Sequence, residues 1–230
     1  MGARLATAVL AVALALCAAG PARAVPEAAY GLHWGMAVDE VLDLGWELEY
    51  VGRFEDWGDE YYAHRYPPWL DDVAQVILFF GFDDRLWRIA VISNGYRSDG
   101  HGENLLARYE EMKVRMEEVY GPGVEQRHFD PQIQAHPENV LGTFQMGWSW
   151  LFTDYETESE KIQLGIRPGN VAEARWGLYI KSKALEPLER KAAEAWTADQ
   201  AAKKAAEDAA KNAARDTTGA AAAPGPEDGH

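Results

Sequence analysis

The stretch VAQVILFFGF, at positions 73–82, decides the fold of this chain. If this stretch is a strand, apolar side chains lie on both of its faces. Val76, Leu78 and Phe80 point to one face, and Ile77 and Phe79 point to the other. A strand that is apolar on both faces lies centrally in a sheet and is covered on both sides. The polar turn DDR at 83–85 and the apolar segment 86–93 follow it, so the sequence predicts an antiparallel hairpin.

Segments typical of further strands lie on both sides of this hairpin. The segments 46–54 and 61–66 precede it and are rich in aromatic residues. After it, 146–152, 162–167 and 175–183 each carry apolar side chains on one alternation. In most of these segments polar residues alternate with the apolar ones, which predicts an antiparallel sheet with one solvated face.

Two helices are also predicted. A short one near 35–42 has apolar residues at helical spacing and is followed by Gly45. A longer one at 104–120 ends at Gly121, before Pro122. One stripe of the longer helix is apolar and carries Leu105, Tyr109, Met112, Met116 and Tyr120.

A helix followed by about four strands therefore occurs twice along the chain. We predict an α+β domain at 25–183, in which helices pack on an antiparallel sheet. Its tandem helix-plus-four-strand units would lie at 31–95 and 101–183. The two halves share a pattern and little identity, so two unrelated hairpins are the alternative.

The composition changes abruptly after position 184. Ala pairs recur from 192–193 to 213–214, and Ala has the highest intrinsic helix propensity. No large apolar side chain follows Trp196. We expect a charged, Ala-rich, solvent-exposed helix at 184–216 that acts as a spacer, a docking arm or a coiled-coil strand. A disordered tail at 217–230 would follow it.

The N-terminus resembles a secretory signal peptide. Arg4 provides a positive charge, an apolar run ends at Cys17, and Ala22-Arg23-Ala24 has the form of a cleavage site. We expect cleavage after Ala24 and a periplasmic or secreted protein with no transmembrane segment in the mature chain. A lipoprotein acylated at Cys17 is the alternative, which Leu16 just before the cysteine disfavours.

Composition excludes several classes of function. The chain has 22 Lys and Arg against 37 Asp and Glu, for a net charge of −15, and lacks the basic stripe that nucleic-acid binding requires. Cys17 is its one cysteine. A mature form that begins after Ala24 would therefore have no disulfide, thiolate nucleophile or Cys-ligated zinc.

One cluster has the residue types of a catalytic or metal site. Asp99, His101 and Glu103 alternate with glycines in one loop, where an imidazole and two carboxylates could surround a metal ion or a reacting proton. A hydrophilic turn before a helix explains the same residues, and the other internal histidines lack metal-ligand spacing. No nucleophile elbow, P-loop, dinucleotide motif or HExxH helix occurs. We therefore predict no enzyme, metal or cofactor.

Aromatic residues are the second candidate site. Trp57, Trp69, Tyr61 and Tyr62 lie in or beside the early strands, with both tryptophans next to turn residues. They could form a stacking platform for a glycan or line a pocket for a small apolar ligand. The alternative is a core built from large side chains.

Two motifs carry a resemblance to a known family. The segment LHWGM at 32–36, followed by VDEV at 38–41, and the turn FDDRL at 82–86 resemble a superfamily of secreted bacterial domains. It includes the β-lactamase inhibitor protein and the SmpA/OmlA-type envelope lipoproteins. The resemblance implies a short helical layer on an antiparallel sheet, repeated in tandem in the inhibitor protein, and a binding or scaffolding role in the envelope.

The sequence thus favours an exported, non-enzymatic bacterial envelope protein that binds or scaffolds another envelope protein. A metal-dependent or acid/base hydrolase that uses Asp99, His101 and Glu103 is the alternative from another class. A binder of a glycan or small ligand is the third option.

Overall fold

The computed structural model describes most of the chain after its first 28 residues. The described residues are 29–65, 72–97, 101–131, 133, 137–169 and 173–220. The predicted signal peptide at 1–24, with Cys17 and Ala24, lies outside them, as do Trp69 and Asp99. Those predictions are therefore not tested by the fold.

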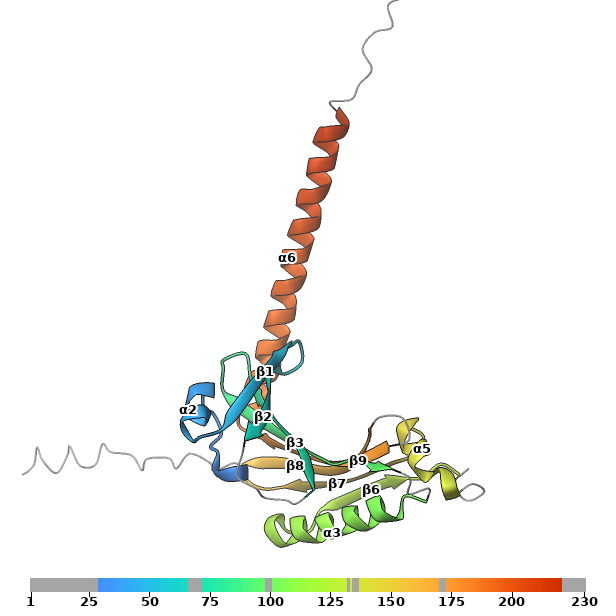
Figure 1. Ribbon diagram of the computed structural model, residues 1–230. Helices are drawn as coiled ribbons and strands as arrows, with labels where there is room; N and C mark the ends of the chain where they lie inside the picture. Colours follow the sequence, from blue (N-terminus) through green and yellow to red (C-terminus); the bar gives the residue numbers. More distant parts are fainter. Residues whose placement is uncertain are drawn as a thin grey trace, which may run out of the picture.

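Nine antiparallel strands form one sheet in the described part of the chain (Figure 1). Eight of them run in the order β1-β2-β3-β4-β9-β8-β7-β6, and the two-residue β5 pairs with β9. The strands are β1 (Glu47–Phe54), β2 (Gly58–Arg65), β3 (Val73–Phe80), β4 (Leu86–Ser93), β5 (Tyr96–Arg97), β6 (Val124–His128), β7 (Trp150–Glu156), β8 (Glu160–Pro168) and β9 (Glu173–Ser182).

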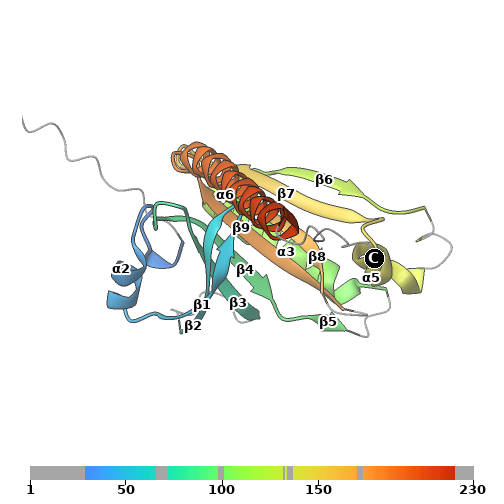
Figure 2. The ribbon, with the colours of Figure 1, turned by 90° about the horizontal axis from the view of Figure 1, so that it is seen from above.

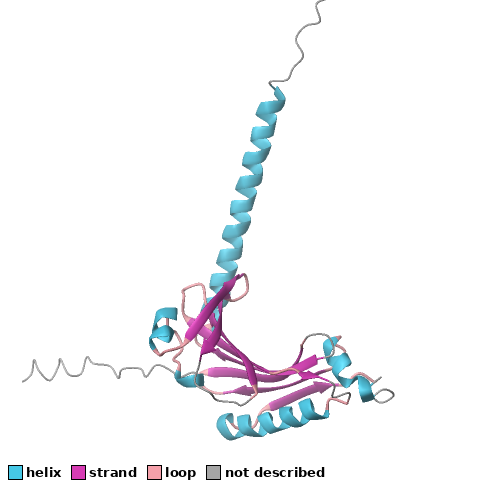
Figure 3. Cartoon of the chain, viewed as in Figure 1, coloured by secondary structure: helices cyan, strands magenta, loops and turns pink. Residues whose placement is uncertain are grey.

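Helices accompany this sheet on both sides (Figure 3). The α-helices are α2 (Val38–Asp43), α3 (Glu103–Tyr120), α5 (Val140–Gln145) and α6 (Glu186–Ala220), and the 3₁₀ turns are η1 (Ala29–Gly31) and η2 (Pro137–Asn139). The predicted α+β class, with helices on an antiparallel sheet and a C-terminal helix, is confirmed. Among the described helices, none is long and apolar enough to cross a membrane.

Two meanders of four strands build the sheet. Helix α2 precedes β1 to β4, and α3 precedes β6 to β9. The last strands of the two meanders, β4 and β9, pair with each other, so Val91 lies opposite Leu178 at the seam. The order of a helix and then four strands thus occurs in each half, with α5 added between β6 and β7.

The start of β7 differs from the prediction. Met146 and Trp148 do not share a strand face with Trp150, because α5 ends at Gln145 and β7 begins only at Trp150. Gly147 adopts the left-handed conformation with φ 71°, which turns the chain between the two elements. Alternating apolar residues here mark a helix end and a turn.

The main core lies between the sheet and α3. Figure 1 shows α3 running along one face of the second meander. Its predicted apolar stripe is confirmed, since Leu105, Tyr109, Met112 and Met116 are buried. On the strand side, Leu164, Leu178 and Ile180 are fully buried in the same cluster. A Leu in such a site contributes about 2–5 kcal/mol relative to Ala.

The opposite side of the sheet, which we call the open face, has no helix laid along it. Its side chains come from the other alternation of each strand, for example Lys161, Gln163 and Arg167 of β8. Near β3 and β4 it carries a second, smaller apolar cluster of Phe79, Trp87 and Ala90. The predicted strand is therefore buried on both faces at Phe79 and Phe80, whereas Ile77 is only half-buried and Ala74 is exposed.

Asp72 joins four elements beside the start of β3. Its carboxylate accepts hydrogen bonds from Arg108 of α3 at 2.7 and 3.1 Å, from Trp176 Nε1 of β9 at 2.9 Å and from the hydroxyl of Tyr96 of β5 at 2.9 Å. Burial alone would raise the pKa of this carboxyl. The hydrogen bonds outweigh burial and hold its pKa below the ordinary value.

Replacement of Asp72 should therefore destabilise the fold in a pH-dependent way. We expect Asp72→Asn to lower the free energy of unfolding by about 2 kcal/mol at pH 7, because three donors lose a charged acceptor. A folded pKa below the unfolded value makes this contribution present above pH 3.8 and lost as the pH falls through the folded pKa. Urea unfolding of the wild-type protein and of Asp72→Asn, at pH 7 and at lower pH, measures this contribution. If the difference in their free energies of unfolding did not shrink as the pH fell, the charged Asp72 would not be its source.

Helix α6 rises from the open-face side of the sheet and is attached only near its base. In Figure 2 it stands in front of the sheet, while α3 lies behind. Glu186 pairs with Lys161 at 2.9 Å and with Lys181, and Glu189 accepts a hydrogen bond from the Phe82 amide at 2.9 Å. The side chains at 201–212 are all exposed, which agrees with the predicted solvent-exposed helix.

The bounds of this helix differ slightly from the predicted ones. It begins at Glu186 instead of 184 and continues to Ala220, four residues into the predicted disordered tail. The remainder of that tail, 221–230, lies outside the described residues. The added residues, Thr217 to Ala220, include two Thr and one Gly of low helix propensity, so they continue a helix that the Ala-rich turns before them sustain.

Removal of the far part of α6 should leave the domain intact. We expect deletion of 201–230 to change the melting temperature by less than about 2 °C, because no described side chain at 201–212 is buried. Differential scanning calorimetry measures this. A drop of about 5 °C or more would show that the distal helix packs on the domain or on another chain.

Gly81→Ala is the matched control at the base of the helix. A Cβ at Gly81 would lie 1.8 Å from Oε2 of Glu189, so this carboxylate must move and lose the hydrogen bond that it accepts from the Phe82 amide. This single methyl group should lower the melting temperature more than the loss of thirty distal residues does.

Candidate functional site

The predicted catalytic loop does not form a site in the described residues. His101 lies in the turn before α3 and is exposed, and Glu103 is the exposed first residue of that helix. Asp99 lies outside the described residues. Within the part of the chain that the structure describes, no three His, Cys, Asp or Glu side chains are grouped to hold a metal ion. The hydrolase alternative stays a prediction.

The predicted aromatic residues do not share one surface. Trp57 packs against Phe79 with ring centroids 6.0 Å apart and belongs to the cluster on the open face. Tyr61 packs on the main core instead, with its ring 5.3 Å from that of Phe80. Tyr62 is the next residue of β2 and points to the other face. Trp69, as stated above, is outside the described residues.

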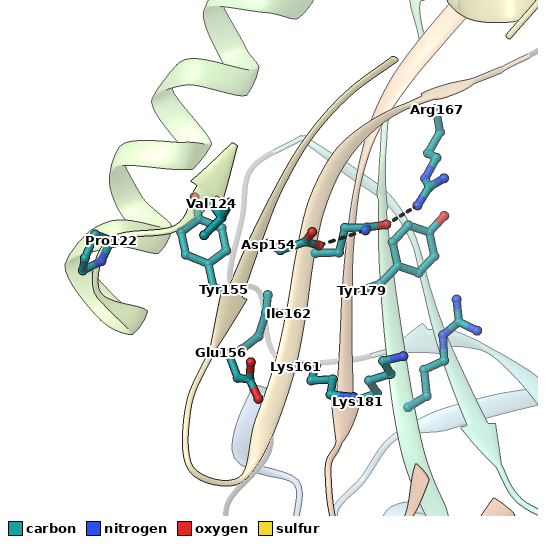
Figure 4. A pocket seen from close by; sticks show the side chains of 12 residues that line it. Pro122, Val124, Asp154, Tyr155, Glu156, Lys161, Ile162, Arg167, Tyr179 and Lys181 are labelled. Carbon is teal, nitrogen blue, oxygen red and sulfur yellow. Dashed lines mark hydrogen bonds between the residues drawn. The ribbon is translucent and has the colours of Figure 1, made fainter. Parts of the chain in front are cut away.

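A different set of residues forms a pocket of about 560 Å³ on the open face (Figure 4). It lies over β7, β8 and β9 and extends to β4 across the seam. Four cations line it, and we call it the basic pocket. Its lining residues are Arg88, Pro122, Val124, Asp154, Tyr155, Glu156, Lys161, Ile162, Gln163, Arg167, Tyr179 and Lys181.

Strand register brings these side chains together. Lys161 of β8 lies opposite Lys181 of β9, which in turn lies opposite Arg88 of β4. The next row on the same face places Gln163 opposite Tyr179. Paired residues of antiparallel strands point to the same side, so both rows project from the open face.

Tyr179 lies at the centre of the pocket with an arginine from each neighbouring strand. The guanidinium carbon of Arg88 is 5.2 Å from the Tyr179 ring centroid, and that of Arg167 is 4.9 Å from it. Arg88 also lies 4.8 Å from the ring centroid of Phe79 and 6.0 Å from that of Trp57. Both arginines are therefore held by cation–π contacts.

Neither arginine forms an ion pair with a carboxylate of the described residues, although the charge of Glu60 on β2 acts on Arg88. No acidic oxygen there lies within ion-pair distance of Arg88 or Arg167, and Arg167 Nε is buried without a hydrogen-bond acceptor. Burial lowers the pKa of Arg88 below its ordinary value. An arginine remains protonated even so, which leaves two poorly compensated positive charges in the pocket.

A glutamine orients one of these arginines. Arg167 donates a hydrogen bond to Oε1 of Gln163 at 2.6 Å, and Nε2 of Gln163 donates to Asp154 at 2.9 Å. Figure 4 draws this relay from Asp154 to Arg167. The amide transmits no charge, so Asp154 positions Arg167 without forming an ion pair with it.

Two glycines and an aromatic stripe border the basic pocket. Gly165 and Gly177 lie opposite each other on the open face, and a Cβ at Gly177 would be 3.1 Å from Cε2 of Tyr179. Glycine at 177 therefore leaves room for the tyrosine ring. Beside Gly165, Trp150 and Phe152 of β7 stack with centroids 5.5 Å apart, and Trp150 is 41% exposed.

Sequence reasoning missed the basic pocket as a site. The alternation of Lys161, Gln163 and Arg167 with apolar residues assigns these side chains to a solvated face, but it does not show which strand is the neighbour. Arg88 comes from the first half of the chain and joins the others only because β4 pairs with β9.

Comparisons of the chain with protein-family models, curated proteins and solved structures find no match in any of the three. The resemblance to the β-lactamase inhibitor protein and the SmpA/OmlA-type lipoproteins is not tested by them. It stays a prediction.

The energetic role of Arg88 can be separated from that of the core. We expect Arg88→Met to change the free energy of unfolding by less than about 1 kcal/mol, because lost cation–π attraction offsets relief of a buried, unpaired charge. Ile89→Ala, one residue along β4 and fully buried in the core, should cost about 2–5 kcal/mol. Urea unfolding compares the two variants. If Arg88→Met lost as much free energy of unfolding as Ile89→Ala, Arg88 would contribute to the stability of the fold.

Proposed function

We propose that this protein is an exported, non-enzymatic envelope protein that binds a protein partner on the open face of its sheet. One observation carries the proposal: Arg88, Arg167, Tyr179 and Trp150 gather on the face that no helix lies along. Arg, Tyr and Trp are the residue types enriched in the energetic centres of protein interfaces. On the other face the large side chains belong to the core beneath α3.

Charge complementarity supports a partner segment that is acidic and partly apolar. The chain as a whole has a net charge of −15, yet the basic pocket is lined by four cations and two carboxylates. A local positive patch in an acidic protein favours an oppositely charged surface and disfavours association of like-charged ones. The adjoining Trp150 and Phe152 add apolar contact area.

Helix α6 supports a scaffolding role for the same protein. It stands on the open-face side and continues for about 30 Å, at 1.5 Å per residue, beyond Gln200, the last half-buried residue among the helix side chains described up to 212 (Figure 1). A bound partner would therefore lie beside the base of an extended arm. Export and an envelope location are part of the proposal and rest on the N-terminal sequence pattern.

Site-specific photocrosslinking tests the proposal. A benzoylphenylalanine at Phe152 on the open face should yield one major adduct with a protein of the native cell envelope, whereas one at Val114 on α3, which is 56% exposed, should yield none. Trp150→Ala should lower the adduct yield at least several-fold. Equal yields at the two positions, or no adduct at Phe152, would contradict binding at the open face.

A further inference from the structure

Arg88 and Arg167 present guanidinium donors that the protein leaves unused. Each stands about 5 Å from the Tyr179 ring, one reaching it from β4 and the other from β8, on the two sides of β9. Rings and a glutamine amide hold them in place, and these groups neutralise no charge. Two cations fixed close together, neither of them in an ion pair with a carboxylate of the described residues, form a preorganised anion site.

The acids nearest the pocket are engaged elsewhere. Asp154 accepts hydrogen bonds from Gln126 and Gln163, and Glu156 pairs with Lys183 at 2.7 Å. Glu186 at the base of α6 pairs with the pocket lysines. The described chain thus satisfies Lys161 and Lys181. Glu60 acts on Arg88 through its charge but forms no ion pair with it, and Arg167 donates to Gln163, so both arginines keep further donors for a ligand from outside.

The positions of the two guanidinium groups favour an anion that has two separate carboxylates. Two guanidinium groups that approach one ring from different strands suit two separate carboxylates, each of which can accept a bidentate pair of hydrogen bonds. Next to them, Gly165 and Gly177 let the side chains of Phe152 and Tyr179 lie close against the sheet. Trp150 and Phe152 then offer a surface for an apolar side chain.

We propose that Arg88 and Arg167 bind the carboxylates of an acidic peptide segment, in which two Asp or Glu residues flank an aromatic or aliphatic one. Tyr179 and Gln163 are the positioning residues of this site. The inference rests on the proposed function, since it names the chemistry by which the partner is recognised on the open face.

Peptide binding tests the inference without knowledge of the partner. The probes are acetyl-Ser-Glu-Phe-Glu-Ser-amide, its analogue with both Glu replaced by Gln, and inorganic phosphate, titrated into the full-length protein by calorimetry. We expect the acidic peptide to bind at least about tenfold more tightly than the Gln analogue and than phosphate. Equal binding of phosphate would identify a site for small free anions and overturn the proposal.

Variants locate the site. Arg88→Gln and Arg167→Gln should each weaken binding of the acidic peptide about tenfold. Arg115→Gln, a matched exposed arginine of α3 that pairs with Glu111, should leave it unchanged. Equal losses in all three variants would indicate non-specific attraction and overturn the site. Circular dichroism confirms that each variant is folded before it is compared.

The same variants separate this inference from the proposed function. The double variant of Arg88 and Arg167 should abolish the adduct formed from Phe152. An intact adduct in the double variant would keep the open face as the binding surface and overturn recognition of carboxylates by the arginines. A concentration-dependent dimer that the double variant removes, seen in sedimentation velocity, would identify a second copy of this chain as the occupant and overturn a separate partner.

Discussion

The pairing of β4 with β9 is the constraint on which the rest of this structure depends. Five residue pairs join the two meanders there, and their alternation assigns each side chain to one face. Ile89, Val91, Leu178 and Ile180 of these pairs enter the core, while Arg88, Tyr179 and Lys181 project from the open face. A slip of one residue in this register would exchange the two sets, so the hydrophobic core fixes the geometry of the basic pocket.

The two faces of the sheet therefore contribute differently to stability. Burial of Leu164, Leu178 and Ile180 beneath α3 supplies stability, at about 25 cal/mol for each Å² of apolar surface removed from water. The other face holds Arg88 in a poorly solvated place, where no carboxylate of the described residues forms an ion pair with it, and this does not help folding. Local features that lower stability persist where function requires them. This contrast is the reason why we propose the basic pocket as the recognition site of the described chain.

Much of the fold could be predicted from local sequence patterns. Period-two alternation at 73–93 and period-3.6 spacing along α3 gave the central hairpin and the main helix, because both patterns report directly which face of an element is buried. Three features were beyond such patterns. The aromatic residues near Met146 fit a strand, but the turn at Gly147 decides otherwise. Aromatic content also did not show that Tyr61 packs on the main core while its neighbour Tyr62 points to the other face. The site itself depends on Arg88 and Arg167, which are far apart in sequence and meet only through strand order.

The ion pairs at the base of α6 connect the arm to the pocket electrostatically. Glu186 belongs to the helix, whereas Lys161 and Lys181 belong to the pocket wall. If the helix base were displaced, this carboxylate would leave the pocket and the net charge there would become more positive by one elementary charge. If the pocket bound the proposed acidic segment, a ligand carboxylate near the two lysines would compete with Glu186. Thermodynamic reciprocity then requires that a force on the distal helix and the affinity of the pocket influence each other.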